Sequence, residues 1–353
     1  MFFVPSNSKY ISKVVRLALG ITFGFGVAQM GNWQMSFLLP IFMSMLLTGP
    51  RISLTMGFGF IVMILIGSML GMALTVSVVQ MPFVCLLVIS LAMFHIFYAG
   101  NKGLPPLLVV MLLMGVTAIP LVGLQSSGAA WMVVRGLAIG GTIAVIFTIV
   151  FFWLIPEVES VDAQAPVKAK IESPLRSAVI STLVIIPLVI MFYTYSWTGG
   201  ILIFVFASIL AQTPDLTSGI RGSGALLIAN AVGGIFAIIV YSLIVMVPEF
   251  VFLLLLMFLV SLVFAQKIFS ASPYAALYGT AFTAVLLLVG NSMGVVSGSA
   301  TENFITRILQ IMVAAMYIVS AFYILDRLFG HENESSEEVS DRPESALITE
   351  AGA

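Results

Sequence analysis

Charged side chains are scarce in this sequence: only 8% of its 353 residues are Asp, Glu, Lys or Arg, against roughly 25% in a soluble domain. Hydrophobic residues make up 61% of the chain. A water-soluble protein of that composition would lack the polar side chains needed to cover its surface. The composition therefore predicts that lipid surrounds most of the chain. The net charge of −1 excludes little, because the placement of charges carries more information than their sum.

The side chains that most enzymes and metal centres depend on are also few. Cys85 is the only cysteine and there are two histidines, which excludes an intrachain disulfide and argues against a metal site built from Cys or His. No Lys follows a Gly, so there is no phosphate-binding loop of the ATPase type. The acids Asp215, Glu249, Glu302 and Asp326 all lie near the ends of apolar runs. We expect no enzymatic activity, no cofactor, no metal and no nucleic-acid partner.

Long apolar runs dominate what is present. A helix needs about 20 apolar residues to cross a bilayer, and the sequence contains twelve runs near this length. They lie at 10–30, 33–49, 53–77, 82–100, 104–124, 131–155, 177–196, 198–213, 219–246, 248–268, 271–290 and 304–328. The predicted fold class is therefore an all-α polytopic membrane protein with about 12 transmembrane helices.

The distribution of Lys and Arg predicts the orientation of these helices. If the N-terminus is cytoplasmic, only Arg135 and Arg307 of the 14 basic residues fall on the opposite side. The other twelve are Lys9, Lys13, Arg16, Arg51, Lys102, Lys168, Lys170, Arg176, Arg221, Lys267, Arg327 and Arg342. This bias favours an even number of helices and cytoplasmic N- and C-termini. The N-terminal run is too long for a cleavable signal.

Two polar segments divide the chain. Residues 1–155 are expected to form a first six-helix unit, 156–176 a cytoplasmic linker and 177–329 a second six-helix unit. Residues 330–353 form an acidic tail with the composition of a disordered segment. The tail is interpreted as a solvated end or as a docking segment.

The two units resemble each other in sequence. Residues 33–50 align with 197–214 without a gap, with six identities in eighteen positions that include Trp33/Trp197 and Pro50/Pro214. Gly67 matches Gly233 and Pro82 matches Pro248, both 166 residues apart, and Arg135 matches Arg307 near the end of each unit. Since each unit holds six runs, both enter the membrane in the same direction and form parallel repeats. The seam between such repeats is a natural path for a solute; alternatively, the duplication only built a larger bundle.

Arg135 and Arg307 are the main candidates for function, because charges inside a bilayer are costly. Each lies about one turn into the last predicted helix of its unit, at a similar depth. Since Arg stays charged and binds carboxylates through two N–H groups, the pair is interpreted as an anion site. The alternatives are that the side chains reach outward to lipid phosphates or that Arg307 pairs with Glu302.

Five further residues are secondary candidates for the solute path. Arg51 and Arg221 lie at the expected cytoplasmic mouth, although topology alone explains basic residues there. Asn230 lies within an apolar helix and is interpreted as a bond across a helix interface or as a substrate contact. Trp33 and Trp197 open the second helix of each unit, where they fit an interfacial aromatic belt or a surface for stacking aromatic solutes.

These elements together resemble a known family. The Trp33-to-Pro50-Arg51 and Trp197-to-Pro214 segments, the Arg221-Gly222-Ser223-Gly224 segment, and the final helices opening on Arg135-Gly-Leu and Arg307-Ile-Leu resemble the fusaric acid resistance and aromatic acid exporter superfamily. The resemblance implies export of aromatic carboxylic acids across a Gram-negative inner membrane, with a periplasmic membrane-fusion-type adaptor and an outer-membrane channel as partners. The large soluble domain common between the halves of such exporters is replaced here by the short linker, as in a compact branch.

The hypothesis from sequence is an inner-membrane efflux permease for small organic anions. A passive anion channel of the same fold and a non-transporting membrane scaffold are the alternatives. The sequence predicts neither the substrate nor the coupling ion nor the oligomeric state.

Overall fold

The computed structural model describes residues 8–31, 33, 35–77, 81–156, 173–195, 216–272 and 274–293, together with seven single positions between 305 and 324. Ten α-helices lie within these residues. They are α1 (Ser8–Gly31), α2 (Leu38–Thr48), α3 (Leu54–Ser77), α4 (Pro82–Asn101), α5 (Pro106–Gly123), α6 (Ser127–Leu154), α7 (Pro174–Thr194), α9 (Leu216–Met246), α10 (Phe250–Ile268) and α11 (Ala275–Ser292).

Seven of these helices are long and apolar enough to cross a membrane: α1, α3, α4, α6, α7, α9 and α10. Three shorter apolar helices lie at Leu38–Thr48, Leu108–Gly123 and Ala275–Gly290. The prediction of an all-α, multi-pass membrane protein is confirmed at this level. The expected spans 198–213 and most of 304–328, the linker residues 157–172 and the acidic tail lie outside the described residues.

The helix boundaries follow local sequence signals. Proline occupies the first position of α4, α5 and α7, where its missing N–H costs no hydrogen bond. Ser126 caps α6, because its Oγ accepts a hydrogen bond from the Ala129 N–H at 3.0 Å. This cap starts α6 at Ser127, four residues before the predicted start at 131.

Several threonine hydroxyls inside the helices are hydrogen-bonded within their own helix. Thr22, Thr117 and Thr182 each donate to the carbonyl four residues earlier, at 2.7, 2.6 and 2.7 Å. Such local bonds allow threonine to lie in an apolar environment without an orphaned donor. These threonines therefore fit a helix that lipid or other helices surround.

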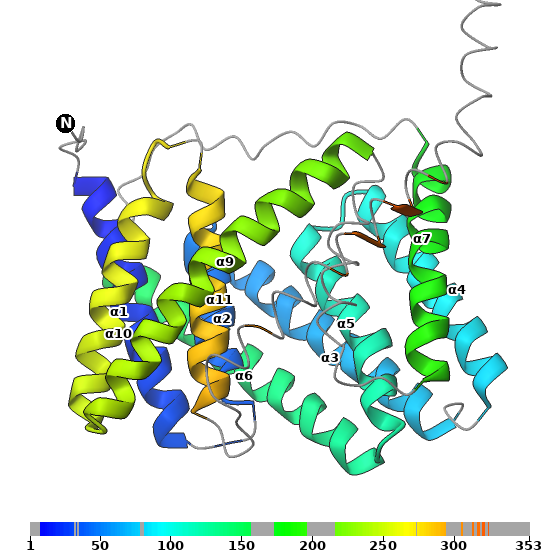
Figure 1. The fold of residues 1–353 in the computed structure, drawn as a ribbon, viewed down its shortest axis with the longest axis horizontal. Coiled ribbons are helices and arrows are strands. Elements are labelled where there is room, and N and C mark those ends of the chain that lie inside the picture. The colour runs from blue at the N-terminus through cyan, green and yellow to red at the C-terminus, as the bar shows by residue number, and fades with distance from the viewer. Residues whose placement is uncertain are drawn as a thin grey trace, which may run out of the picture.

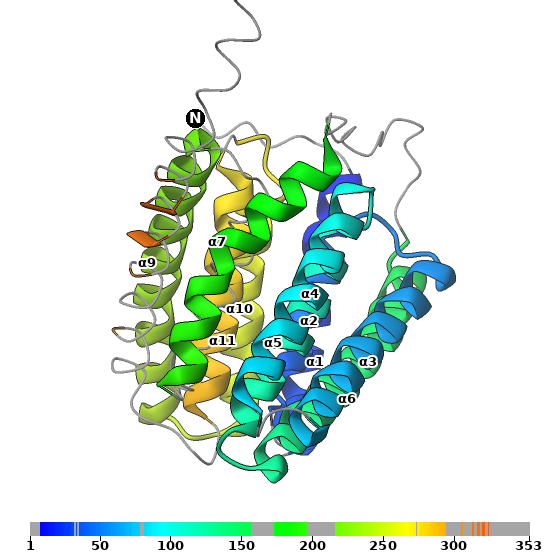
Figure 2. The same ribbon diagram turned by 90° about the vertical axis from the view of Figure 1, so that its right-hand side faces the viewer.

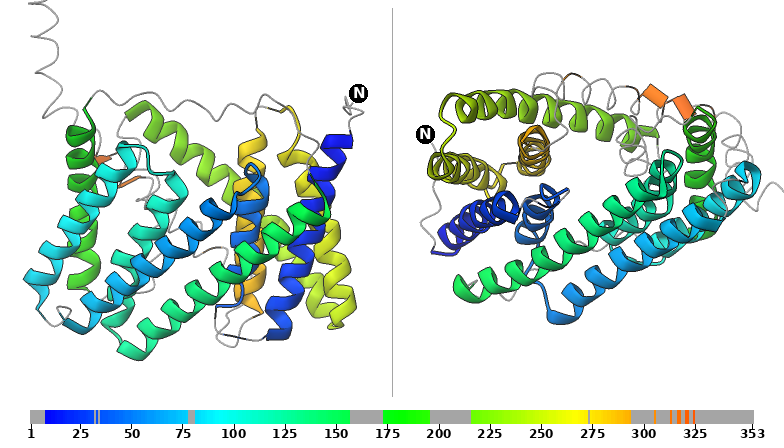
Figure 3. Two further views of the ribbon diagram at one scale, coloured as in Figure 1. Left: turned by 180° about the vertical axis from the view of Figure 1, so that it is seen from behind. Right: turned by 90° about the horizontal axis from the view of Figure 1, so that it is seen from below.

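The helices are arranged around two lateral pairs formed by segments far apart in sequence. α1 packs against α10 at one end of the long axis, and α4 packs against α7 at the other end (Figure 1). α9 runs along one side of the molecule while α3 and α6 run along the opposite side (Figure 3). Turned by 90°, the molecule shows α3 and α6 side by side in one layer (Figure 2).

Side-chain hydrogen bonds join the lateral elements. The Tyr10 hydroxyl donates to the Gln266 carbonyl at 2.8 Å, which ties α1 to α10. The Tyr193 hydroxyl donates to the Thr117 carbonyl at 3.1 Å, which ties α7 to α5. One apolar core collects side chains of α1, α2, α3, α5, α6, α9, α10 and α11, and a second collects side chains of α4, α5 and α7.

Two helix crossings depend on small residues. α3 meets α5 where Gly67 and Gly71 face Gly115, and a Cβ added at Gly71 would lie 2.9 Å from the Cβ of Ile119. α9 meets α11 at Gly233, where an added Cβ would lie 2.8 Å from the Cβ of Ala284. Small residues let backbones approach closely, which stabilises helix pairs in lipid. Close packing matters there because apolar side chains gain little by moving from lipid into a helix interface.

Candidate functional site

Arg135 lies deeper in its helix than the sequence predicted. It is the ninth residue of α6, because the Ser126 cap starts the helix at Ser127. At 1.5 Å per residue, its Cα lies about 12 Å along the axis from the first helical residue. The expectation of about one turn was wrong, since hydropathy alone does not detect a capped polar start.

Arg135 is exposed on the protein surface between apolar neighbours. Trp131, Met132 and Ile139 lie on the same helical face and are 49%, 45% and 41% exposed. Among the described residues, the Arg135 guanidinium makes no hydrogen bond, ion pair or cation–π contact. Within the described part of the chain, Arg135 is thus a cation without a partner on the apolar face of a candidate span.

The other described candidates do not converge on Arg135. Arg51 is an exposed residue in the connection between α2 and α3, and Asn230 is fully buried in the middle of α9. Trp33 is half-buried against the core, and among the described residues its buried indole Nε1 has no hydrogen-bond partner. Within the described part of the chain, no hydrogen bond or cation–π contact joins Arg51, Trp33 and Arg135 to one another.

Trp33 also lies differently from the prediction. It was expected to open the second helix, but α2 begins five residues later, at Leu38. Turn hydrogen bonds span the interval, and Met35 has a positive φ of 60° that breaks a helix extending from Trp33. A hydropathy average extends a helix through such a turn because the apolar Met35 and Phe37 outweigh the polar Ser36.

Four predicted site residues remain untested in their contacts. Trp197, Glu302 and Arg307 lie outside the described residues. Arg221 is part of α9 in its backbone, and its side chain lies outside what the structure describes. The proposed pairing of Arg135 with Arg307 therefore stays a prediction.

Sequence reasoning missed the role of Arg16, which it counted only toward topology. Arg16 is 1% exposed, the largest fully buried side chain among the described residues. Its Cζ lies 3.9 Å from the centroid of the Phe152 ring, and its Nη1 donates to the Ile155 carbonyl at 3.4 Å. Both partners lie at the C-terminal end of α6, where the helix dipole favours a cation. The signal was present, since Arg16 is a charge inside the first apolar run.

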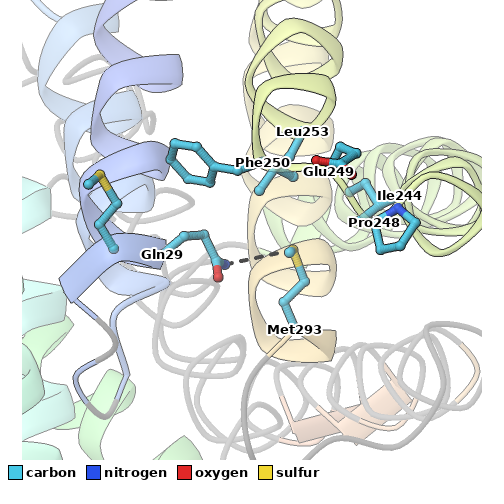
Figure 4. Close-up of a pocket in the computed structure, with 8 residues that line it drawn as sticks. Gln29, Ile244, Pro248, Glu249, Phe250, Leu253 and Met293 are labelled. Carbon is cyan, nitrogen blue, oxygen red and sulfur yellow. Dashed lines mark hydrogen bonds between the residues drawn. The ribbon is translucent and has the colours of Figure 1, made fainter.

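A pocket lies where α1, α9, α10 and α11 meet, at the end of the bundle opposite the N-terminus. Its volume is about 340 Å³, at the lower end of the range for small-molecule sites. Gln29 from α1 and Met293, just after α11, face each other across it, and Phe250 reaches from α10 toward α1 (Figure 4). The Gln29 Nε2 lies 3.7 Å from the Met293 sulfur and donates to it.

The described residues contain no group of three His, Cys, Asp or Glu side chains that could hold a metal ion. Cys85, the only cysteine, is a buried free thiol in the α4–α5–α7 core. Metal binding is accordingly not suggested by this part of the chain.

Comparisons with known proteins reach only the first half of the chain. Residues 13–151 match a family model described as "Protein of unknown function (DUF2955)". No curated protein and no solved structure matches this chain. The matched segment runs from α1 through most of α6 and includes Arg16, Trp33, Arg51 and Arg135.

Proposed function

We propose that the protein is a membrane permease built from two parallel six-helix repeats, with 198–213 and 304–328 completing twelve spans. The helix pairings support the repeat. α1 packs against α10 as α7 packs against α4, and α3 crosses α5 as α9 crosses α11. Both equivalences are expected if a two-fold axis along the membrane normal relates the two halves.

Residue positions within the pairs support the same repeat. The α3–α5 crossing uses Gly67 and Gly115, and the α9–α11 crossing uses Gly233 and Ala281, so both partners are displaced by the same 166 residues. Burial along α1 also recurs in α7 at the sequence offset of 164: Leu17, Ile21 and Phe25 are buried, and so are Ser181, Ile185 and Val189. These matches are better explained by one helix arrangement that is repeated in the two halves, here called the common helix frame, than by two unrelated bundles.

We further propose that the cargo is a small organic anion, and Arg135 is the observation that carries this. Its guanidinium lies on an apolar face inside a span without a partner among the described residues, where a charged side chain is costly unless it serves a function. An aromatic carboxylate supplies both an anionic group and a ring for the neighbouring apolar surface. The resemblance to aromatic acid exporters supports outward transport through a bacterial inner membrane, with a periplasmic adaptor and an outer-membrane channel as partners.

The direct test is flux in liposomes that contain the purified full-length protein. Benzenesulfonate is a suitable aromatic anion, because it stays charged and does not cross lipid as a neutral acid. We expect wild-type protein to carry it in preference to benzylammonium, and Arg135→Gln to lower the flux about tenfold, equivalent to 1.4 kcal/mol. Arg176→Gln is the matched control, since it removes another exposed arginine, at the start of α7, that is not a candidate for the solute path. Equal fluxes for wild type and Arg135→Gln would refute the anion site.

The same liposomes separate the alternatives. A flux that follows an imposed membrane potential without any coupling ion identifies a passive anion channel. Absence of flux combined with loss of cellular function on deletion of residues 331–353 identifies a scaffold that docks through its tail.

The proposed topology, with cytoplasmic termini, is tested by cysteine labelling in a Cys85→Ala background. Lys102 and Ser127 are exposed residues before α5 and at the start of α6. A membrane-impermeant maleimide added to intact cells is expected to label Ser127→Cys and to spare Lys102→Cys. Labelling of both, or of Lys102→Cys alone, contradicts the orientation.

A further inference from the structure

Glu249 gives the pocket between α1, α9, α10 and α11 a charge of its own. It lines the pocket and is the one acidic residue in the part of the chain that the structure describes. It occupies the N-cap position of α10, yet its side chain makes no capping hydrogen bond. No hydrogen bond or ion pair of its carboxylate is present among the described residues. The Glu249 carboxylate therefore does not cap α10.

Gln29 adds a second oxygen acceptor on the opposite wall. Its amide nitrogen donates to the Met293 sulfur, which leaves the amide oxygen as the remaining polar atom of that side chain. A carboxylate and an amide oxygen both accept hydrogen bonds, and neither donates. The group that matches two acceptors and one negative charge is an ammonium, which has three donors, a positive charge and no acceptor.

The remaining lining is apolar and narrow. Phe250, Leu253 and Met293 contribute ring, aliphatic and thioether surface. α1 and α10 close one side tightly, because a Cβ added at Gly26 would lie 2.9 Å from Leu254 Cδ2. Such walls favour a slender hydrocarbon chain, whose burial contributes about 0.8 kcal/mol per methylene.

The position of the pocket also suits an amphiphile. α1 ends at Gly31, α9 ends at Met246, α10 begins at Phe250 and α11 ends at Ser292, so the pocket lies where four helices end. The ends of membrane-spanning helices lie near the polar headgroup region. A ligand there has its charged group at the water interface and its chain among the helices.

We propose that this pocket binds a primary ammonium group carried on an apolar chain, with Glu249 as its counter-charge and Gln29 as a second acceptor. The site is separate from Arg135 and does not depend on the anion transport proposed above. The same chemistry is found in free alkylamines and in the ethanolamine headgroup of a phospholipid.

The test is equilibrium binding of tritiated decylammonium to the full-length protein, immobilised in detergent and read by scintillation proximity. Unlabelled decylammonium, decanol and decanoate compete, so that chain length is constant and only the charge varies. Wild type is expected to prefer decylammonium over decanol and decanol over decanoate. Glu249→Gln should weaken decylammonium binding about fivefold, as for an exposed ion pair, and bring it level with decanol.

Three variants make the result specific. Glu249→Asp keeps the charge and should retain binding, whereas Gln29→Leu should weaken it with Glu249 intact. Glu344→Gln removes an equal charge from the acidic C-terminal segment and should leave binding unchanged. Protection of Cys85 from a maleimide shows that each variant is folded, because this thiol is fully buried.

Competition by phosphatidylethanolamine, with none by phosphatidylglycerol, identifies a lipid headgroup as the natural source of the ammonium. Absence of competition by either lipid, with the preference for decylammonium intact, identifies a free amphipathic amine. The proposal is overturned if decanoate competes as well as decylammonium, or if Glu249→Gln binds decylammonium as tightly as wild type.

Discussion

Substitution of Gly71 by alanine tests whether the α3–α5 crossing stabilises the bundle. The added Cβ would lie 2.9 Å from the Cβ of Ile119 and closer still to the Gly115 carbonyl oxygen. Carbon atoms in contact are normally about 3.5–4.0 Å apart, so the two helices must separate by roughly 0.6 Å or more. The obstacle is backbone, which cannot rotate away as a flexible side chain would.

The expected loss follows from two opposing effects. Overpacking of a tight interface costs up to about 3 kcal/mol, and a separation of this size forfeits a quarter or more of the dispersion energy across the crossing. Replacing glycine by alanine inside a helix returns about 1 kcal/mol. We expect a net destabilisation of about 2 kcal/mol, or roughly 4 °C in Tm at about 2 °C per kcal/mol for a large domain.

The chain supplies its own reporter and its own control. Cys85 is the only cysteine, is fully buried, and packs in the same core as α5. A maleimide dye that fluoresces on reaction therefore reports thermal unfolding in detergent. Gly59 is on the same helix, and a Cβ added there meets nothing within 4 Å, so Gly59→Ala should leave Tm unchanged or raise it by up to about 2 °C. A Gly71→Ala protein that melts within about 1 °C of Gly59→Ala would refute the packing argument.

Three more predictions use the same assay. Gly233→Ala should lower Tm by a similar amount, about 4 °C, because its Cβ would lie 2.8 Å from that of Ala284; no change would contradict an equivalent crossing of α9 and α11. Arg16→Ala should lower Tm more than Arg16→Met, since it leaves a cavity against Phe152 worth about 2 kcal/mol or more; an equal loss in both variants would show that the guanidinium charge rather than its volume matters. In the native protein below its Tm, Cys85 should react with maleimide at least about tenfold more slowly than in denaturant, because only an opening of the core exposes it; rapid native labelling would contradict the described α4–α5–α7 core.

Hydropathy predicted the helices well because membrane solvation acts on each helix separately. The run expected at 53–77 appears as Leu54–Ser77, and that expected at 82–100 appears as Pro82–Asn101. Boundaries were wrong where local hydrogen bonds decide them. Ser126 lengthens α6 by capping it, and the turn around Met35 delays α2.

Lateral packing could not be predicted from the same signal. Lipid tails are as apolar as leucine, so hydropathy does not distinguish a lipid-facing side chain from one that faces another helix. The pairing of α1 with α10 brings Gln29 and Glu249 to one pocket although they are far apart in sequence. Arg16 was missed for a related reason, since a basic residue near the start of a span satisfies the topology rule whether it is exposed or buried.

The two lateral pairs differ in the positions that carry charge. At the offset that aligns α1 with α7, Arg16 corresponds to Ile180; after the matched prolines Pro82 and Pro248, Glu249 corresponds to Phe83. The α4–α7 pair packs without either charge, so the common helix frame does not require them. A charge that the shared arrangement does not need is a candidate for function. Substitutions that alter function are therefore expected to concentrate at Arg16 and Glu249, in the α1–α10 pair, rather than in the α4–α7 pair.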